Sequence, residues 1–293
     1  MDIVFVILHY MAIKETKQSV QYIQENIDTE QYHIIIVDNA SENGTGSELQ
    51  KIYQENSKIT VLVNHENLGF AKGNNVGFYY AKKRWNPDYI VLMNNDVFLL
   101  EKAFLAKTKK EYTRSKFAVM GPMILTRDGR CDINPLKPEF NSAADIEKKI
   151  LHYKRDLRRY QYHYAPLYYK LAGIKGVLSG WKRKPKLFYR HAENIKLHGC
   201  FLVFSQDYIQ DYDGLDDSTF LFWEEEFLYK HMICDGKVLA YNPDITVFHL
   251  EDASTDVSIL GKREKMIFML RHYIDSLNSL KKVYMEYDGN NEG

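Results

Sequence analysis

In residues 59–77, ITVLVNHENLGFAKGNNVG, an apolar run passes directly into a polar, glycine-rich segment. The first five residues are apolar or β-branched, which predicts a strand buried on both faces. Helical spacing begins near residue 71 and predicts a helix over 71–84. A strand that leads at once into a helix is half of a βαβ unit, so this stretch indicates an α/β fold with a parallel sheet.

The same alternation extends in both directions from this stretch. Further apolar runs lie at 3–8, 33–37, 89–93 and 117–120, and helix-period segments lie at 14–27, 46–56 and 101–113. Gly121 and Pro122 are expected to close this half. Right-handed crossovers place the carboxyl ends of parallel strands at one edge, which is where open α/β sheets bind ligands.

The second half returns to short elements after residue 197. GCFLVFS at 199–205 predicts a strand, 224–235 predicts a helix, and VLAY at 238–241 and ITVF at 245–248 predict two further short strands. Residues 262–284 have the spacing of a helix. We therefore expect one domain over 1–256 with a helical insertion at about 131–197, followed by a helical tail over 257–293.

Composition restricts the class of protein. A chain of 293 residues that is 45% hydrophobic can bury a large core. Its cysteines, Cys131, Cys200 and Cys234, have neither CxxC nor zinc-finger spacing, which favours a reducing compartment. We expect no signal peptide and no segment that spans a bilayer. The expected location is the cytoplasm, with the inner face of the cell membrane as a candidate site.

Positive charge is concentrated in residues 147–190. This segment holds 13 Lys and Arg against Glu147 and Asp156, a net charge of +11 in a chain whose formal net charge is zero. Apolar residues recur at helical spacing within 146–164 and 167–181, so two basic amphipathic helices are predicted.

The basic segment has three interpretations. It could contact an anionic membrane peripherally, or it could cover the active site or form a dimer contact. Nucleic-acid binding is the third, but it would leave the polar motifs at the strand ends without a purpose. We therefore expect no nucleic-acid partner.

Polar residues follow the second and third strands. Asp38 and Asn39 come directly after HIIIV, where they could hold a base or ribose, or simply form an Asx turn. Gly69, Gly73 and Gly77 share one helix face, which permits close approach of a ligand or of another backbone. The glycine segment is not a GxGxxG fingerprint, and no Gly-rich turn follows the first strand, so a Rossmann dehydrogenase is disfavoured.

Two more strand ends carry candidate metal ligands. LMNND at 92–96 ends the fourth strand, and the carboxylate of Asp96 suits a divalent ion that bridges a diphosphate. An NND triplet is also a common turn. His249 ends ITVF; a single His there is commonly structural, but it is a candidate second ligand if Asp96 binds an ion.

Three carboxylates open the helix predicted at 224–235. Glu224, Glu225 and Glu226 are flanked by aromatic residues, an apolar setting that could raise a carboxyl pKa towards the range of a general base. Acidic residues in a first helical turn also complement the helix dipole. Both interpretations stay open on these residues alone.

In order along the chain, these segments resemble glycosyltransferase family 2, and most closely its bacterial rhamnosyltransferase-like branch. That branch has VDNAS, ENxGFAxGNNxG, LLNPD, GxxLLxRR, FFLYxEDxDL and a late His. This chain has VDNAS, ENLGFAKGNNVG, LMNND, GCFLVFS, FLFWEEEFL and FHLEDAS. The resemblance covers about 1–125 and 197–256. It implies a GT-A fold, with a mostly parallel central sheet flanked by helices.

The resemblance also implies a nucleotide-sugar site. By position, Asp38 would contact the base, and the remaining nucleotide-sugar residues would be His9, Asn67, Gly69, Asn74, Asn75, Asn94, Asn95 and Asp96. Asp96 and His249 fall on the family's metal ligands for Mn²⁺ or Mg²⁺. Glu225 falls on the general base, and Glu224 is its catalytic neighbour.

The implied reaction is an inverting transfer from a nucleotide-diphosphate sugar, dTDP-rhamnose or a UDP-hexose, to a saccharide hydroxyl. The acceptor would belong to cell-surface polysaccharide synthesis and could be linked to a lipid diphosphate. Two departures stand out: Asn95 replaces the family's proline, and Glu225 replaces its aspartate. They leave a non-catalytic sugar-nucleotide binder as the alternative. A sugar-nucleotide pyrophosphorylase is disfavoured because HYMAIKE at 9–15 replaces the Gly- and Arg-rich loop of those enzymes.

Overall fold

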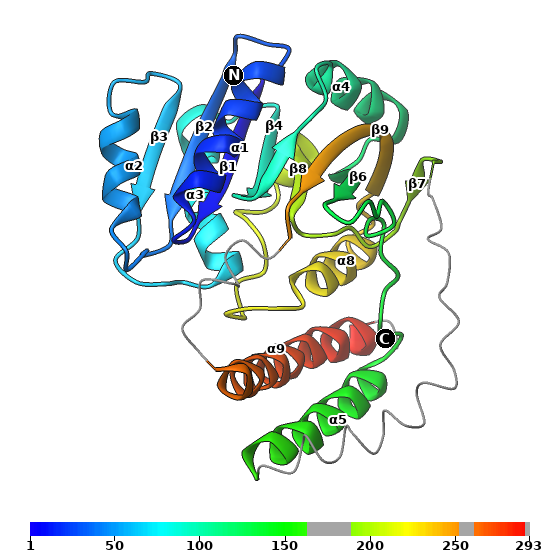
Figure 1. Cartoon of the computed structure of the whole chain (residues 1–293). Helices are drawn as coiled ribbons and strands as arrows, with labels where there is room; N and C mark the ends of the chain where they lie inside the picture. Colours follow the sequence, from blue (N-terminus) through cyan, green and yellow to red (C-terminus); the bar gives the residue numbers. More distant parts are fainter. Residues whose placement is uncertain (163–188, 252–260, 291–293) are drawn as a thin grey trace.

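The computed structural model describes residues 1–162, 189–251 and 261–290, and a mixed α/β sheet lies at its centre (Figure 1). Within these residues the sheet has nine strands, in the order β3-β2-β1-β4-β8-β6-β9-β5, with β7 paired to β9. The strands are β1 (Ile3–His9), β2 (Tyr32–Asp38), β3 (Ile59–Val63), β4 (Tyr89–Asn94), β5 (Val97–Leu99), β6 (Val119–Thr126), β7 (Ala192–Glu193), β8 (Phe201–Ser205) and β9 (Leu239–His249). The predicted fold class is confirmed.

Apart from the short α7, which was not predicted, the described helices agree with the predicted segments to within about six residues. They are α1 (Ile13–Asn26), α2 (Thr45–Tyr53), α3 (Phe70–Trp85), α4 (Phe104–Ser115), α5 (Ala143–Gln161), α7 (Gln206–Ile209), α8 (Glu224–Cys234) and α9 (Lys262–Asn290). The second basic helix, predicted over 167–181, lies outside the described residues. Among the described helices, none combines the length and the apolar character that crossing a bilayer requires.

Strand direction brings the important residues to one edge of the sheet. β3, β2, β1 and β4 are mutually parallel, β8 runs antiparallel to β4 and β6, and β9 runs parallel to β6. The carboxyl ends of β1, β2, β4, β6 and β9 therefore lie together. His9 is in register with Asp38, and Leu8 with Asn94.

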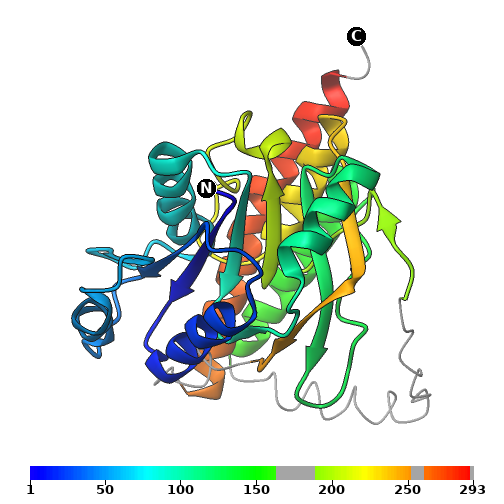
Figure 2. The same cartoon turned by 90° about the horizontal axis from the view of Figure 1, so that it is seen from above.

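Helices cover both faces of the sheet, as the view from above shows (Figure 2). Alternate residues of each strand point to opposite faces. In β1, Ile3, Phe5 and Ile7 join the cluster with α1, α2 and α4, whereas Val4 and Val6 join the cluster with α3, α7 and α8. This double burial is why the strands are near-continuous apolar runs.

Two predictions about the sheet are wrong. Gly121 and Pro122 do not end the first half, because they lie inside β6 and pair with β9. VLAY and ITVF are not separate strands, because both belong to β9. The β6–β9 register shifts between Pro122 and Met123. Pro122 has no N–H to donate to the neighbouring strand. The shift in register beside it lets β6 and β9 resume pairing beyond the proline.

A third layer is built from α5 and α9, which lie side by side below the sheet in Figure 1. Its core also includes Phe227 of α8. The fully or largely buried members are Phe140, Ile146, Ile150, Phe227, Ile274, Leu277, Leu280 and Tyr284. The predicted insertion and the predicted tail thus pack on each other and on α8. The division into a domain over 1–256 and a tail over 257–293 stays a prediction.

Candidate active site

Asp96 and His249 lie side by side at the carboxyl edge of the sheet. Asp96 directly precedes β5, which pairs antiparallel with the end of β9, so that Val97 is opposite His249. The backbone N–H of Leu250 donates to the Asp96 carbonyl at 3.1 Å. His249 Nε2 lies 3.3 Å from Asp96 Oδ1, and both residues are buried. The tertiary structure therefore joins two candidate ligands that are far apart in sequence.

These two side chains form a pair rather than a complete metal site. Among the described residues, no group of three or more His, Cys, Asp or Glu side chains is arranged to hold an ion. The second ring nitrogen of His249, Nδ1, is buried and has no hydrogen-bond partner. An unpartnered buried nitrogen is costly unless a ligand completes it. A carboxylate next to an imidazole is a donor set that a divalent cation accepts.

Glu225 reaches the same region from α8. The Glu225 Oε1 atom accepts a hydrogen bond from the Gly199 N–H at 3.2 Å. The residue after Gly199, Cys200, belongs to the same edge, because its carbonyl accepts a hydrogen bond from the Asn94 N–H at 2.9 Å. Burial raises the pKa of the Cys200 thiol, and the carboxylates of Asp96 and Glu225 raise it further. The Asp96 and Glu225 carboxylates therefore both lie close enough to Cys200 to affect its thiol. Glu225 itself is only half-buried.

His198 is a site residue that the sequence analysis missed. Its ring lies 5.9 Å from the ring of His249, centroid to centroid. Burial lowers the pKa of His198, and Glu225 partly offsets this effect. His198 Nδ1 accepts from the Cys200 N–H at 3.2 Å, so the other nitrogen is left to carry the proton in the neutral ring. The sequence signal that could have identified His198 is its position immediately before the strand GCFLVFS.

Glu224 differs from Glu225 although the two are adjacent. It is 9% exposed, and its Oε1 has no hydrogen-bond partner. Burial raises the pKa of Glu224 to about 8, and the Glu225 charge adds to this rise. Glu226 points elsewhere, because it accepts from the Lys196 ammonium and from the Glu139 N–H. The three carboxyls of the cluster thus have three environments.

The chain is strained just before these carboxyls. Phe222 and Trp223 have φ values of 74° and 72°, a left-handed conformation that side chains with a Cβ rarely adopt. Such strain costs about 1–3 kcal/mol per residue and persists only where packing enforces it. Here the Tyr273 ring of α9 lies 4.4 Å from Phe222, and Ser276 Oγ donates to the Leu221 carbonyl. The strained turn orients the start of α8.

Asn39 organises the loop that follows β3. Its amide group donates to Asn67 Oδ1 and to the Gly69 carbonyl, and its carbonyl oxygen accepts from the Leu68 N–H. Asp38 is buried and accepts from the Ser41 hydroxyl and N–H. Asx-turn hydrogen bonding is therefore present at 38–41. Asn67 is exposed at this edge.

The glycine face of α3 packs against protein. A Cβ added at Gly73 would lie 2.7 Å from Leu8, one at Gly77 would lie 2.3 Å from Val6, and one at Gly69 would lie 2.0 Å from the Phe220 carbonyl oxygen. These glycines let the helix approach β1 and the 220 segment closely. Beside them, Asn74 is buried and its Oδ1 has no hydrogen-bond partner.

Three of the predicted nucleotide-sugar residues are occupied by contacts inside the protein. His9 is fully buried, and its ring nitrogens lie 2.7 and 2.9 Å from the hydroxyls of Thr16 and Thr45. Asn95 donates to the Ala12 carbonyl and to Thr16. Burial lowers the pKa of His9 to about 4, so the ring is neutral at physiological pH. These side chains hold α1 and α2 to the sheet edge.

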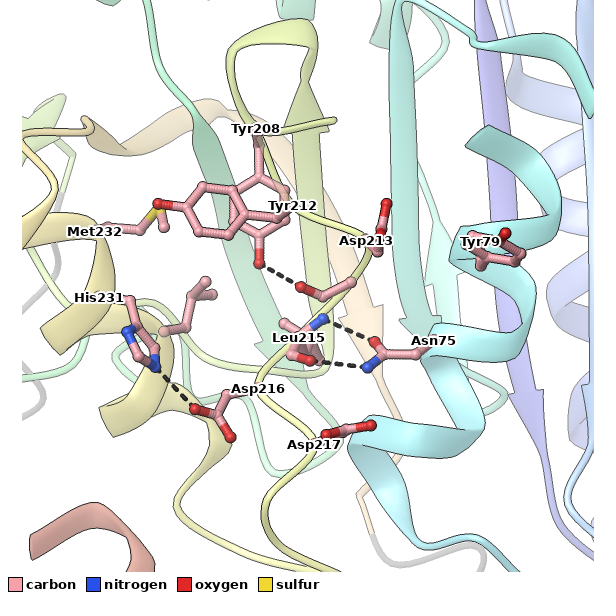
Figure 3. A pocket seen from close by; sticks show the side chains of 12 residues that line it. Asn75, Tyr79, Tyr208, Tyr212, Asp213, Leu215, Asp216, Asp217, His231 and Met232 are labelled. Atoms are coloured by element: carbon pink, nitrogen blue, oxygen red, sulfur yellow. Dashed lines mark hydrogen bonds and ion pairs between the residues drawn. The ribbon is translucent and has the colours of Figure 1, made fainter. Parts of the chain in front are cut away.

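Asn75 is the third, and it lines a cavity of about 430 Å³ between α3, the 208–217 segment and α8 (Figure 3). Its amide exchanges two hydrogen bonds with the backbone of Leu215, at 2.7 and 2.8 Å. Across the cavity His231 Nε2 lies 2.8 Å from Asp216 Oδ2. None of Asp96, Glu225 and His249 lines it. The cavity is therefore separate from the catalytic candidates.

Comparison with known proteins agrees with this architecture. A family described as Glycosyl transferase family 2 matches residues 5–179, more than half of the chain. No curated protein matches the sequence. Among solved structures, S. aureus TarS 1–349 superposes with a TM-score of 0.53 at 10% identity, over 94% of this chain and 72% of that one.

Two further solved structures are similar. S. aureus TarS 1–349 in complex with UDP-GlcNAc has a TM-score of 0.52 and 12% identity, over 98% of this chain and 71% of that one. The structure of GalNAc-T7 with UDP, GalNAc and Mn²⁺ has a TM-score of 0.55 and 11% identity, over 98% of this chain and 55% of that one. At these identities the likeness shows the fold alone. Together with the family match it identifies the chain as a glycosyltransferase of family 2 with the GT-A fold.

Proposed function

We propose that this glycosyltransferase moves a sugar from a nucleotide-diphosphate donor to a saccharide hydroxyl with inversion at the anomeric carbon. The observation that carries the proposal is the convergence of Asp96, His249 and Glu225 at the carboxyl edge of the sheet. Asp96 directly precedes β5, His249 ends β9, and Glu225 belongs to the first turn of α8. This is the edge at which α/β sheets bind ligands.

Glu225 is the proposed general base. It removes the proton from the acceptor hydroxyl while that oxygen bonds to the anomeric carbon, and the bond from that carbon to the diphosphate breaks with its electrons on the leaving oxygen. Half-burial and the single hydrogen bond from Gly199 leave one carboxylate oxygen for the hydroxyl. The transition state resembles that of glycoside hydrolysis. Glu224, kept neutral by burial, can donate a hydrogen bond beside it.

Asp96 and His249 are the residues that would hold a Mn²⁺ or Mg²⁺ ion. The short separation of His249 Nε2 from Asp96 Oδ1, 3.3 Å in a buried setting, fits this assignment. A divalent ion there would supply Lewis-acid stabilisation of the leaving diphosphate. For the nucleotide we propose Asp38, Asn67, Gly69, Asn74 and Asn94 as the contacting residues. His9 and Asn95 would position this group from behind, because they are hydrogen-bonded to residues of α1, α2 and the turn before α1. Asn75 lines the separate cavity beside α8.

The donor is proposed to be a UDP-hexose or dTDP-rhamnose. TarS has been crystallised with UDP-GlcNAc, and GalNAc-T7 with UDP, GalNAc and Mn²⁺, which favours a uridine donor. The motif resemblance to the rhamnosyltransferase-like branch favours dTDP-rhamnose. The proposed acceptor is a saccharide of cell-surface polysaccharide synthesis, linked to a lipid diphosphate at the cytoplasmic face.

Two substitutions and a control test this function. Glu225→Gln should lower the transfer rate by about a hundredfold or more, because a general base contributes roughly 10²–10⁴, while the donor still raises the melting temperature. Asp96→Asn should weaken the Mn²⁺-dependent part of that thermal shift. Asp217→Asn, an exposed carboxylate, is the control.

The same measurements distinguish the alternative function. A non-catalytic binder would show the thermal shift with donor and Mn²⁺ but would release no sugar to any acceptor in a screen of nucleotide sugars. Normal transfer by Glu225→Gln would remove Glu225 from the role of base. A thermal shift that did not depend on Asp96 would remove the metal assignment.

A further inference from the structure

Helix α5 has one face built into the protein and one face without a described partner. Ile146 and Ile150 of its inner face are fully buried against α9, and Tyr153 and Leu157 pack beside them. Tyr153 stacks on Tyr273 of α9 at 5.2 Å. The helix begins with a Ser142 cap that accepts from the Asp145 N–H. Packing against α9 therefore fixes the orientation of α5 and determines which of its residues face outward.

The outer face of α5 is a basic stripe that includes an exposed Leu and ends in an exposed Tyr. Positions separated by three and four residues lie on one side of a helix. The exposed residues at this spacing include Lys148, Leu151, Arg155 and Arg158 on α5 and Tyr162 directly after it, with Lys154 beside them. Leu151 is 51% exposed and Tyr162 is 72% exposed. We call these six residues the α5 outer face.

Most basic residues of the α5 outer face form no ion pair with a described residue. Lys148 pairs with Asp145 at 3.1 Å, but Lys154, Arg155 and Arg158 have no ion pair with any residue in the described ranges. The acidic residues of α5 serve other contacts: Glu147 pairs with Lys281 of α9, and Asp156 is buried and pairs with Arg159. No acidic side chain belongs to the α5 outer face.

We propose that the α5 outer face rests on the surface of an anionic lipid bilayer. Lysines and arginines that flank exposed Leu and Tyr on a single helix are typical of helices lying in a membrane interface. A second copy of the same face is disfavoured, because two uncompensated positive stripes repel each other. Nucleic acid is disfavoured because Leu151 lies in the middle of the stripe, where phosphate contacts would be needed.

Helix α5 and the segment before it contact the residue that precedes the carboxyl cluster of α8. The Lys149 ammonium lies 5.8 Å from the Trp223 ring centroid, and the Phe140 ring lies 5.4 Å from that of Trp223, the residue before Glu224. This inference rests on the proposed function: bilayer contact through α5 would hold the start of α8 near a lipid-linked saccharide. Membrane contact through α5 would therefore support an acceptor that is attached to a membrane lipid.

Vesicle co-sedimentation of the full chain at low ionic strength tests this proposal. The protein should pellet with vesicles of phosphatidylcholine containing phosphatidylglycerol, and not with phosphatidylcholine alone, and salt should release it. Each basic residue near an anionic surface contributes roughly a fivefold change in partitioning. The triple variant Lys154→Gln, Arg155→Gln, Arg158→Gln should therefore bind about a hundredfold more weakly.

A matched control carries the same change of charge elsewhere. Lys14→Gln, Lys17→Gln and Lys110→Gln lie on α1 and α4 and are exposed, and this variant should retain at least about a tenth of the native partitioning. Leu151→Ser, which keeps the charge, should weaken binding separately. Circular dichroism melting confirms that each variant is folded.

Three results would overturn the proposal. They are equal binding to both vesicle compositions, equal loss in the two triple variants, and concentration-dependent dimers that the α5 variant abolishes. Transfer to a water-soluble acceptor should be unchanged in the α5 variant. A protein that bound vesicles but transferred no sugar would contradict the proposed function and leave the α5 surface standing.

Discussion

At the scale of single residues, Glu224 and Glu225 show how burial separates two adjacent carboxyls. Glu225 is half-buried and accepts a hydrogen bond from Gly199, whereas Glu224 is enclosed and has an unpartnered oxygen. A low dielectric disfavours the charged form of the enclosed group. One carboxyl can then act as a base while its neighbour remains protonated, a division that sequence alone does not predict for three consecutive glutamates.

The first prediction concerns Glu224 and pH. Burial raises its pKa from 4.5 to about 8, so between these values the native protein keeps a proton that the unfolded chain has lost. The free energy of unfolding should therefore fall as pH rises through this window. Glu224→Gln should flatten that part of the profile, as measured by urea unfolding at several pH values. Exposed Glu55→Gln should not, and a steep profile in Glu224→Gln would contradict this origin.

At the scale of elements, the start of α3 is fixed by the residue that caps it. Gly69 has φ 81° and ψ −167°, a region open to glycine alone, and Phe70 N–H donates to the Phe220 carbonyl at 2.9 Å. The cap thereby joins the loop after β3 to the segment before α8. Two motifs separated by about 150 residues meet at one glycine.

The second prediction compares two helix caps. Gly69→Ala should lower the free energy of unfolding by about 3 kcal/mol or more, because it combines a forbidden backbone with a clash against the Phe220 carbonyl. Gly44 caps α2 with φ 77° in open space. Gly44→Ala should cost only about 1–2 kcal/mol. Denaturant unfolding measures both, and equal costs would show that the contact with the 220 segment does not matter.

At the scale of the whole molecule, the α5 and α9 layer supports the strained turn before α8. Phe227 of α8 is buried with Leu277 and Leu280 of α9, while Tyr273 and Ser276 hold Phe222 and Leu221. The last helix of the chain therefore stabilises the segment that carries the proposed base. A strained conformation requires such a support, since on its own it would relax.

The third prediction tests this support. Leu277 is fully buried, so Leu277→Ala should cost about 2–5 kcal/mol through lost burial and a cavity. Met285 on the same helix is 57% exposed, and Met285→Ala should stay within about 0.5 kcal/mol. Urea unfolding gives both values. Loss of transfer activity should accompany Leu277→Ala under conditions where the protein remains folded; unchanged activity would separate α9 from the site.

Local patterns were sufficient for much of the architecture. Apolar runs and helical spacing predict the strands from Ile3 to Met93 and helices α1 to α4, because these elements are buried in ways that leave a period in the sequence. They fail at β9, where a bulge beside Pro122 joins two apparent strands, and at β5, whose three residues carry no period. The strand-end motifs also predict correctly that polar residues gather at one edge of the sheet.

What the motifs could not predict is which of those residues remain available to a ligand. His9, Asn75 and Asn95 have the composition of a binding site, yet their polar atoms meet Thr16, Leu215 and Ala12 inside the protein. Conversely, His198 joins His249 and Glu225 only because β8 begins and β9 ends at the same edge, where α8 also begins. Burial, pKa and free hydrogen-bonding capacity depend on neighbours distant in sequence, and those neighbours come together only when the chain is folded.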